Sequence, residues 1–412
     1  MRTVSGYFPP LVTLETFIAQ VLSTDHSCRD AVAQVVAQRL ADGQAPCSSD
    51  TGGYCKARQR LPEALVLRLV QATGQGLEAH AEPSWTWQGR TVKLVDGTTV
   101  SMPDTLANQA DYPQPPGQAP GVGFPQARWV GLIGLATGAV TAVGSGANQG
   151  KATGEHALLR PLLASLAPGE VLLGDSYYRS YWLLAQLQAQ GVDGVFELHS
   201  RRGSGWLAGQ QETQVVWSKP TQRPDWMDEA TYQRMPMTLT LRGSRSRKKV
   251  LVTTLLDTGH YSRQAIAMLY SKRWLVEVDL RFIKPVMQMG ILRGKTPGMV
   301  RKEIGVHLLA YNLIRTVIAQ AAKRYARAPR TVSFTAALQL LVAFQTKGWL
   351  DTDTAISDAY KPLFQAISRH RIGNRSGRSE PRAVKRRPKA YPRLTKPRQQ
   401  AREELFLDLQ EA

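Results

Sequence analysis

Two short apolar segments, each with an aspartate, constrain the fold of this chain most strongly. Asp96 lies in KLVDGT, and Asp175 ends the apolar run VLLGDS. The stretches GEHALLRPLLASLAPG and YYRSYWLLAQLQAQG, before and after the second segment, have the apolar spacing of helices. Strands that alternate with helices predict an α/β sheet.

Each aspartate alone has a simpler interpretation. An aspartate that ends a strand is more often a turn former or a helix cap than part of a site. A carboxylate among apolar neighbours is nevertheless costly to bury unless it is paired or binds a metal ion. Open α/β sheets usually bind ligands at the carboxyl ends of their strands, so Asp96 and Asp175 can converge there. A third acid at the same place would favour the functional interpretation.

A later helical stretch supplies that third acid. From Ser262 to about Met289 the spacing predicts one long helix. Four polar residues form a stripe within an arc of roughly 60°, at about 100° per residue. The members of this polar stripe are Tyr270, Arg273, Glu277 and Lys284. Apolar residues expected to pack against the core lie on another face: Leu275, Val278 and Phe282. An ordinary amphipathic helix would show the same pattern.

The combination of motifs resembles a known family. Tyr-x2-Arg-x3-Glu-x6-Lys, following KLVDGT and VLLGDS, is similar to the signature of the DDE transposases of bacterial insertion sequences, in the branch named for its Y-R-E-K motif. The resemblance covers roughly residues 89–325. It implies an α/β fold with an RNase H-like catalytic core. A β-rich insertion at about 200–247 would interrupt this core.

The resemblance also implies a chemistry. Such an enzyme binds the terminal inverted repeats of an insertion sequence, cleaves the ends and joins the 3′ hydroxyls to target DNA. Asp96, Asp175 and Glu277 would be the catalytic residues and the metal ligands. An all-carboxylate set suits Mg²⁺ and tolerates Mn²⁺. Two ions per site would activate the nucleophile and stabilise the charged phosphate.

The rest of the polar stripe is expected to contact DNA. Arg273 and Lys284 can hold phosphates by charge-assisted hydrogen bonds, and Tyr270 can donate its hydroxyl to one. Arg281 and Trp274 lie near the same helical arc and are further candidates for DNA contact. For Trp274, packing in the core is an equally good interpretation.

Tryptophans gather in the expected insertion. They are Trp206, Trp217 and Trp226. One hypothesis is that they stack on a base that is unstacked during cleavage. Ordinary packing is the favoured alternative.

Charge and composition point to a polyanionic partner. The chain has 52 Lys and Arg against 32 Asp and Glu, a formal net charge of +20, which favours nucleic acid over a membrane surface. We expect double-stranded DNA as the partner and no membrane contact, and the resemblance implies a homodimer that holds two ends together. Residues 1–88 would form a helical DNA-binding domain, 89–325 the catalytic domain, and 326–412 a helical region with a basic tail that is disordered when free.

Other site types are not supported by the sequence. The three cysteines Cys28, Cys47 and Cys55 have no zinc-site spacing and do not suggest a disulfide framework. GSGANQGK lacks the residues of a phosphate-binding loop. Neither a secretory signal nor an apolar run of about 18 residues is apparent, so the expected location is the bacterial cytoplasm, in association with the nucleoid.

Two alternative functions remain. The chain could be another RNase H-like nuclease that cuts DNA without joining it. It could also be a transposase-derived DNA-binding protein that has lost catalysis. The three intact acids argue against the second alternative.

Overall fold

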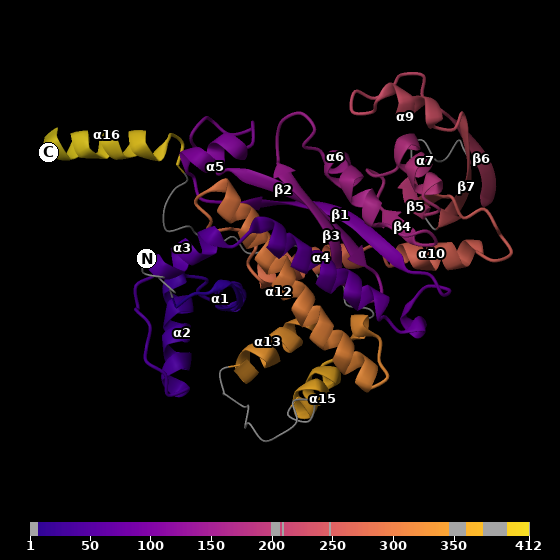
Figure 1. Cartoon of the computed structure of the whole chain (residues 1–412). Coiled ribbons are helices and arrows are strands. Elements are labelled where there is room, and N and C mark those ends of the chain that lie inside the picture. Colours follow the sequence, from indigo (N-terminus) through magenta and orange to yellow (C-terminus); the bar gives the residue numbers. More distant parts are fainter. Residues whose placement is uncertain are drawn as a thin grey trace.

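The computed structural model of the chain describes residues 7–198, 207, 210–246, 249–345, 360–373 and 394–411. Within these residues, eight strands form one mixed sheet in the order β3-β2-β1-β4-β5-β8-β7-β6 (Figure 1). The strands are β1 (Val92–Ser101), β2 (Gln126–Gly134), β3 (Val140–Ala147), β4 (Val171–Gly174), β5 (Asp193–Leu198), β6 (Glu212–Ser218), β7 (Thr238–Ser246) and β8 (Lys249–Thr253).

Helices lie before, between and after these strands. The first group is α1 (Pro10–Leu22), α2 (Cys28–Ala41), α3 (Gly52–Arg60), α4 (Glu63–Ala79), η1 (Pro83–Trp85), α5 (Leu106–Asp111), α6 (Glu155–Leu159), η2 (Arg160–Ser165), α7 (Tyr181–Ala189) and α9 (Glu229–Arg234). The second group is α10 (Arg263–Ser271), α11 (Leu275–Arg281), η3 (Phe282–Val286), α12 (Pro297–Arg324), η4 (Pro329–Thr331), α13 (Phe334–Gln345), α15 (Lys361–Arg369) and α16 (Arg398–Glu411).

The centre of the sheet combines a parallel trio with two antiparallel flanks. Strands β1, β4 and β5 run parallel, and β2 and β3 continue the sheet from β1 as an antiparallel pair. On the other side, β8, β7 and β6 are joined by antiparallel pairing to β5. The expected strand-rich insertion therefore extends the main sheet, with α9 between β6 and β7.

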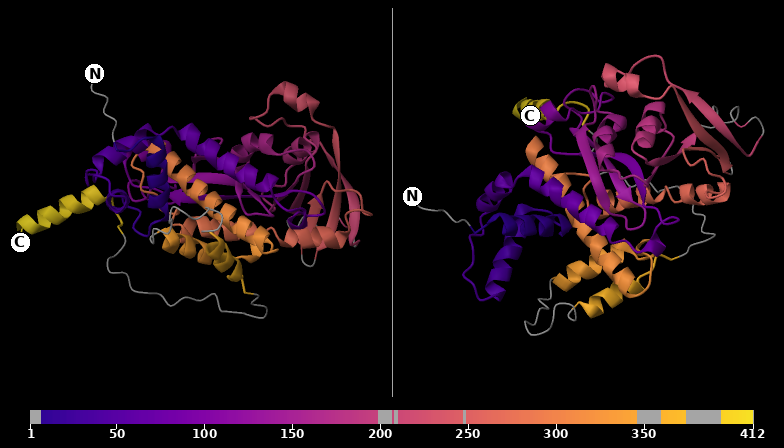
Figure 2. Two further views of the ribbon diagram at one scale, coloured as in Figure 1. Left: turned by 60° about the horizontal axis from the view of Figure 1, so that its bottom comes forward. Right: turned by 45° about the vertical axis from the view of Figure 1, so that its right-hand side comes forward.

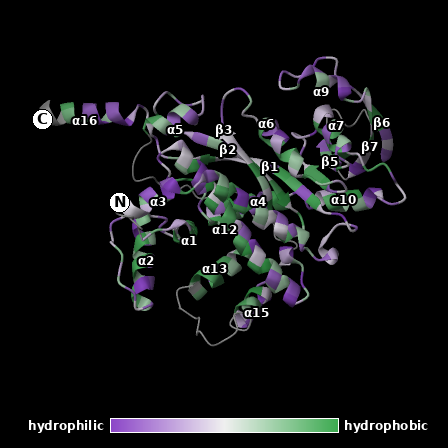
Figure 3. Ribbon diagram, in the orientation of Figure 1, coloured by the Kyte–Doolittle hydropathy of each residue, from purple (hydrophilic) through white to green (hydrophobic). Residues whose placement is uncertain are grey.

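Both faces of the sheet are covered, which explains the continuous apolar runs in its central strands. Leu94 of β1 belongs to a core shared with α1, α4 and α12, whereas its neighbour Val95 belongs to a second core shared with η2 and α7. Figure 3 shows hydrophobic residues concentrated in these central strands. The less buried part of β1 begins at Asp96, directly after the segment that is covered on both faces.

The N-terminal helices share the first core. Helix α4 packs against both α12 and β3, and Asn312 of α12 donates to the carbonyl of Val70 at 3.0 Å and to that of Val140 at 2.9 Å. Gly74 of α4 lies so close to β3 that a Cβ there would be 2.0 Å from the Val140 carbonyl oxygen. The hydrophobic core thus continues across residue 88, where we expect a domain boundary.

The central helix α12 has the composition of a membrane span. It has 28 residues, and 78% of its most apolar window is buried inside the structure. Its neighbours there are α1, α4, α13 and α15 (Figure 2). Its apolar character is therefore used in packing against other helices.

The single long helix expected from Ser262 to Met289 is wrong, because the structure breaks it twice. Helix α10 ends before a turn at residues 272–274, and α11 is followed by the π-helical segment η3. Pro285 lies inside η3, and because proline lacks an N–H it cannot continue the α-helical hydrogen bonds.

The buried face of this segment also differs from the expected one. The fully buried residues are Val276, Asp279 and Ile283, whereas Leu275, Val278 and Phe282 are half-buried. Apolar periodicity could not identify this face because an aspartate lies at its centre.

The end of the chain contains a helix that the sequence did not predict. Helix α16 extends away from the rest of the molecule (Figures 1 and 2). The basic tail that we expect to be disordered spans residues 369–402, and the expectation is wrong for residues 398–402, which begin this helix. Most of the basic stretch, residues 374–393, lies outside the described residues.

Candidate functional site

Strand register brings the two aspartates to one edge of the sheet. In the parallel pairing of β1 with β4, Leu94 is opposite Leu173. Asp96 and Asp175 each lie two residues beyond that pair, so both occur at the same level on neighbouring strands. The strands that the sequence predicted thus place the first two acids side by side.

The surroundings of Asp96 disfavour a negative charge. Burial raises the pKa of its carboxyl to about 6, and the charges of Asp175 and Glu155 add to this, while the Gly97 amide and Arg273 oppose it. The Oδ1 atom accepts a hydrogen bond from the Gly97 N–H at 2.8 Å. A cation at this edge would relieve the cost of keeping the carboxylate charged.

Asp175 begins a turn after β4. Its Oδ1 accepts the N–H of Tyr177 at 2.8 Å, as in an Asx turn. The next residue, Tyr178, is buried and donates its hydroxyl to Glu155 Oε2 at 2.7 Å. Burial, followed by the charge of Glu155, raises the pKa of Tyr178. Asp175 thus forms this turn and is also the second of the predicted acids.

Glu155 is a third acid at this edge that sequence reasoning missed. It is the first residue of α6, and its carboxylate lies against β1, because a Cβ on Gly97 would be 2.5 Å from Glu155 Cδ. Nothing in GEHALL marks Glu155 as functional. The one sequence signal is Gly97 itself, a glycine directly after the candidate acid.

Glu277 is on α11, a helix that contacts β1, the strand that carries Asp96. Its side chain is 59% exposed and accepts a hydrogen bond from Arg273 Nη2 at 2.5 Å. Arg273 also interacts electrostatically with Asp96. Arg273 therefore interacts with both the first and the third predicted acid.

The acids fit a divalent ion in chemistry, although they do not form a closed cage. Asp96, Asp175, Glu155 and Glu277 offer carboxylate oxygens alone, the donors that Mg²⁺ and Mn²⁺ prefer. Among the described residues, no group of three acids, histidines or cysteines is close enough to hold an ion. Glu277 is instead paired with Arg273.

Two members of the polar stripe have hydrogen-bond partners within the protein. Tyr270 is 5% exposed and donates its hydroxyl to Glu197 Oε2 at 3.2 Å, an atom that also accepts from Lys249. Burial raises the pKa of Tyr270. Lys284 donates to Thr98 Oγ1 of β1 at 2.9 Å, and burial lowers its pKa. The breaks in the helix explain why the four side chains do not form one exposed row.

A basic cleft adjoins the stripe. It has a volume of about 860 Å³, and its lining includes four cationic side chains, Arg245, Lys249, Arg263 and Arg273. Trp274 also lines this cleft and is 54% exposed, so it does not pack in the core. Arg281 is exposed on α11.

The tryptophans of the insertion have different environments. Trp217 packs against the second core, as the packing interpretation expects. Trp226 is 41% exposed, and the Arg160 guanidinium lies 4.1 Å from its ring centroid. Trp206 lies outside the described residues.

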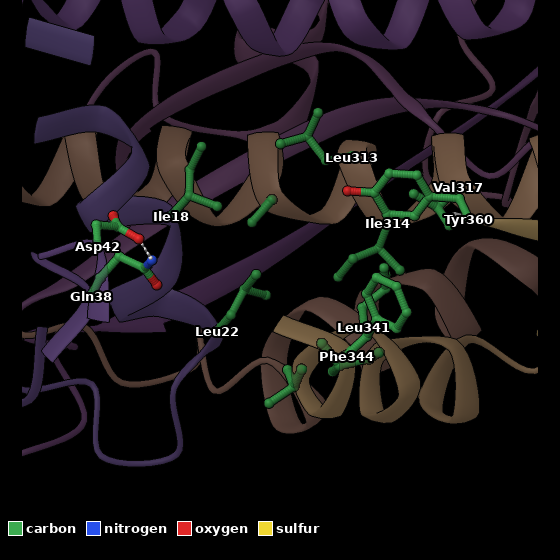
Figure 4. Close-up of a pocket in the computed structure, with 13 residues that line it drawn as sticks. Ile18, Leu22, Gln38, Asp42, Leu313, Ile314, Val317, Leu341, Phe344 and Tyr360 are labelled. Carbon is green, nitrogen blue, oxygen red and sulfur yellow. Dashed lines mark hydrogen bonds between the residues drawn. The ribbon is translucent and has the colours of Figure 1, made fainter. Parts of the chain in front are cut away.

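A second cavity has no catalytic character. It has a volume of about 540 Å³ and lies between α1, α2, α12 and α13 (Figure 4). Its lining is mostly aliphatic and aromatic, and its acid Asp42 accepts a hydrogen bond from Gln38 at 2.9 Å. It contains none of the acids described above.

Comparison with known proteins identifies the family. Residues 87–313, more than half of the chain, match the model of the transposase DDE domain. The chain belongs to this DDE transposase family. The matched segment contains both strand aspartates, Glu277 and the whole polar stripe, so the resemblance inferred from the motifs is confirmed.

Two individual proteins are similar to this family member. The transposase InsG for insertion sequence element IS4 of Escherichia coli (strain K12) is 27% identical over 352 residues, which cover 83% of this chain and 78% of InsG. A cryo-EM structure of the piggyBac transposase synaptic complex with hairpin DNA covers 92% of this chain and 89% of its own chain at 10% identity, with a TM-score of 0.39. That score is too low to support an argument.

Proposed function

We propose that the chain is the transposase of a bacterial insertion sequence, which binds the terminal inverted repeats, hydrolyses the phosphodiesters at the ends and joins the 3′ hydroxyls to target DNA. Its membership of a family of DNA-cleaving enzymes supports this. The strand order β3-β2-β1-β4-β5, with β1, β4 and β5 parallel, supports an RNase H-like core.

One observation carries the proposal. The β1–β4 register sets Asp96 beside Asp175, and Arg273, which donates to Glu277, also interacts electrostatically with Asp96. Carboxylates clustered on neighbouring strands, with a raised pKa at Asp96, are the pattern of a functional site.

The chemistry assigned to this site uses divalent ions, as the family generally does. Asp96, Asp175 and Glu277 would hold Mg²⁺, or Mn²⁺, in a two-ion site. Bound ions would activate the attacking oxygen and stabilise the charge on the phosphate. For Glu277 to join the aspartates, its carboxylate must leave Arg273, whose guanidinium is then free to hold a phosphate oxygen of the DNA.

The basic cleft gives the DNA a path to these acids. Arg245, Lys249 and Arg263 can hold successive phosphates, and Trp274 offers an aromatic face for a base.

We further propose that the helices of residues 1–88 and the basic tail add DNA affinity, and that Arg281 and Lys284 contact DNA. A homodimer would hold the two ends together. Tyr270 would reach DNA only after leaving Glu197.

Cleavage by a Glu277→Ala variant tests this function. With Mg²⁺ and DNA that carries the element's ends, we expect the variant to bind DNA but to cut it at least about a hundredfold more slowly. Glu229→Ala is the matched control, because Glu229 also pairs with an arginine, Arg223, on an exposed surface. Normal cutting by Glu277→Ala would remove Glu277 from the metal site.

The products separate the alternative functions. A donor plasmid that is cut and then integrated into target DNA supports the transposase. Cutting without integration would indicate another RNase H-like nuclease, and binding without cutting by the wild type would indicate a protein that has lost catalysis.

A further inference from the structure

A buried carboxylate lies two residues after Glu277. Asp279 of α11 has no exposed surface. Its Oδ1 accepts hydrogen bonds from Arg315 at 2.6 Å, from the Tyr311 hydroxyl at 2.9 Å and from Arg330 at 2.7 Å, and its Oδ2 accepts a second bond from Arg330 at 2.9 Å. These three partners are in α12 and η4, so one side chain joins three elements.

The two arginines are themselves held in place. The Arg315 guanidinium lies 5.5, 5.2 and 5.1 Å from the ring centroids of Phe282, Tyr311 and Phe334. Aromatic faces attract a guanidinium, so these rings fix its position as well as burying it.

Arg330 extends the connection to the sheet. Its Nε donates to the Leu135 carbonyl at 2.8 Å, and its Nη2 donates to the Gly134 carbonyl at 2.9 Å, where β2 ends. Asp279 is therefore tied through Arg330 to the strand that pairs with β1, which carries Asp96.

The position of Asp279 on α11 gives these contacts a consequence for Glu277. Two residues correspond to about 200° of helical rotation, so Asp279 and Glu277 lie on opposite faces. Helix α11 has seven residues, with a turn before it and the π-helical η3 after it. The hydrogen-bond pattern changes at both ends of α11. On entry, Glu277 N–H donates three residues back, to the Trp274 carbonyl at 3.1 Å, and η3 after the helix is π-helical. Between these two irregular ends, the inward contacts of Asp279 hold the helix in one rotation.

We propose that Asp279 is a positioning residue: anchored by Arg315 and Arg330, it sets the rotation of α11 and thereby the approach of the Glu277 carboxylate to Asp96 and Asp175. The inference rests on the function proposed above. A buried ion cluster is a weak source of stability compared with apolar packing, so a positional role accounts better for placing one here.

Metal affinity provides a readout other than activity. In the full-length chain, Mn²⁺ binding is followed through the paramagnetic resonance signal of the free ion, and DNA binding and thermal unfolding are measured alongside. We expect Asp279→Asn to weaken Mn²⁺ binding by about tenfold or more, as residues that orient metal ligands do. DNA binding should stay within about threefold, because the basic cleft remains intact.

The control is an arginine–carboxylate pair in the sheet, in which the arginine is buried and the carboxylate is 27% exposed. Arg242 of β7 donates to Glu212 of β6 and to the carbonyls of Leu255 and Tyr261, much as Arg330 donates to Asp279 and two carbonyls. Glu212→Gln should reduce the free energy of unfolding without changing Mn²⁺ affinity. Equal losses of Mn²⁺ affinity in Glu212→Gln and Asp279→Asn would overturn the inference.

A second variant covers the case in which Asp279→Asn does not fold. Arg330→Lys keeps the charge but loses the forked geometry, and its control is Arg242→Lys. We expect weaker Mn²⁺ binding in Arg330→Lys alone. An unchanged affinity in Arg330→Lys would assign the cluster to folding only.

The proposed function and this inference fail differently. If the wild type does not bind Mn²⁺, or Glu277→Ala binds it as tightly as the wild type, the metal assignment fails and the inference fails with it. If those two proteins behave as expected and Asp279→Asn binds Mn²⁺ like the wild type, the inference alone is wrong.

Discussion

At the scale of single residues, the close approach of the Asp96 and Glu155 carboxylates depends on the absence of a side chain at Gly97 as well as on their charges. Gly97 leaves the space in which the Glu155 carboxylate lies, directly beside Asp96. Tyr178 holds the other side of that carboxylate. The charge density at the edge is thus set by how closely Glu155 can approach β1.

Gly97→Ala should therefore impair the site. The new Cβ would be 2.5 Å from Glu155 Cδ, so the carboxylate must move away from Asp96. We expect cleavage of end-bearing DNA to fall by about tenfold or more while DNA binding is retained. Gly243→Ala is the control, since a Cβ on this strand glycine would be 3.6 Å from its nearest neighbour. Equal cleavage by the two variants would remove Glu155 from the site.

The sequence predicted some of these residues and not others for identifiable reasons. Asp96 and Asp175 could be found because each follows a run of apolar strand residues, and residues at the same level on neighbouring strands lie close together. Glu155 and Asp279 could not be found, because their partners are distant in the chain. A buried charge among apolar residues also hides the inward face of its helix from any count of apolar spacing.

At the scale of elements, α4 shows how closely a helix can approach a strand. Gly74 faces β3, and Gly76, two residues later, faces open space. Two residues of helix turn through about 200°, which explains why neighbouring glycines have opposite surroundings.

This contrast predicts opposite effects of one substitution. Gly74→Ala should lower the free energy of unfolding by about 2 kcal/mol or more, because its Cβ would be 2.0 Å from the Val140 carbonyl oxygen. Gly76→Ala should raise it by about 0.5–1 kcal/mol, because alanine is the better helix former. Denaturant unfolding measures both. Loss of stability in Gly76→Ala similar to that in Gly74→Ala would mean that α4 does not pack as described.

Strands were easier to predict than helix ends. The segments around β1, β2, β3, β4 and β8 are apolar because they are covered on both faces, and that pattern is local. The breaks between α10, α11 and η3 depend on Pro285 and on tertiary contacts, which an unbroken apolar spacing does not reveal.

At the scale of the whole molecule, stability should depend on pH through a buried histidine. His307 of α12 is buried, and this burial lowers its pKa to about 4. The ordinary pKa of a histidine is 6.5, and the folded-state pKa of His307 is about 4. Between these two pH values, the unfolded chain binds a proton at His307 that the folded chain does not. The free energy of unfolding should therefore fall as the pH falls through this range.

We expect this histidine to contribute a loss on the order of 2 kcal/mol between pH 7 and pH 4.5. Its stacked neighbour His26 also has a lowered pKa, because of burial, and adds to the loss, whereas burial raises the pKa of Glu303, which opposes it. Urea unfolding at both pH values, in wild type and His307→Gln, isolates the contribution of His307 to the pH dependence of the free energy of unfolding. An equal pH dependence in both proteins would contradict it.

The shared core of α1, α4, α12 and the sheet bears on how such enzymes can change their DNA preference. Val66 and Val70 of α4 lie in the same core as Leu94 of β1, and Asn312 ties α4 to β3. Helices α1 and α4 therefore cannot be exchanged as a module without rebuilding the face of the sheet on which they pack. Under the proposal that these helices bind DNA, a new DNA preference would come from substitutions on their exposed surfaces.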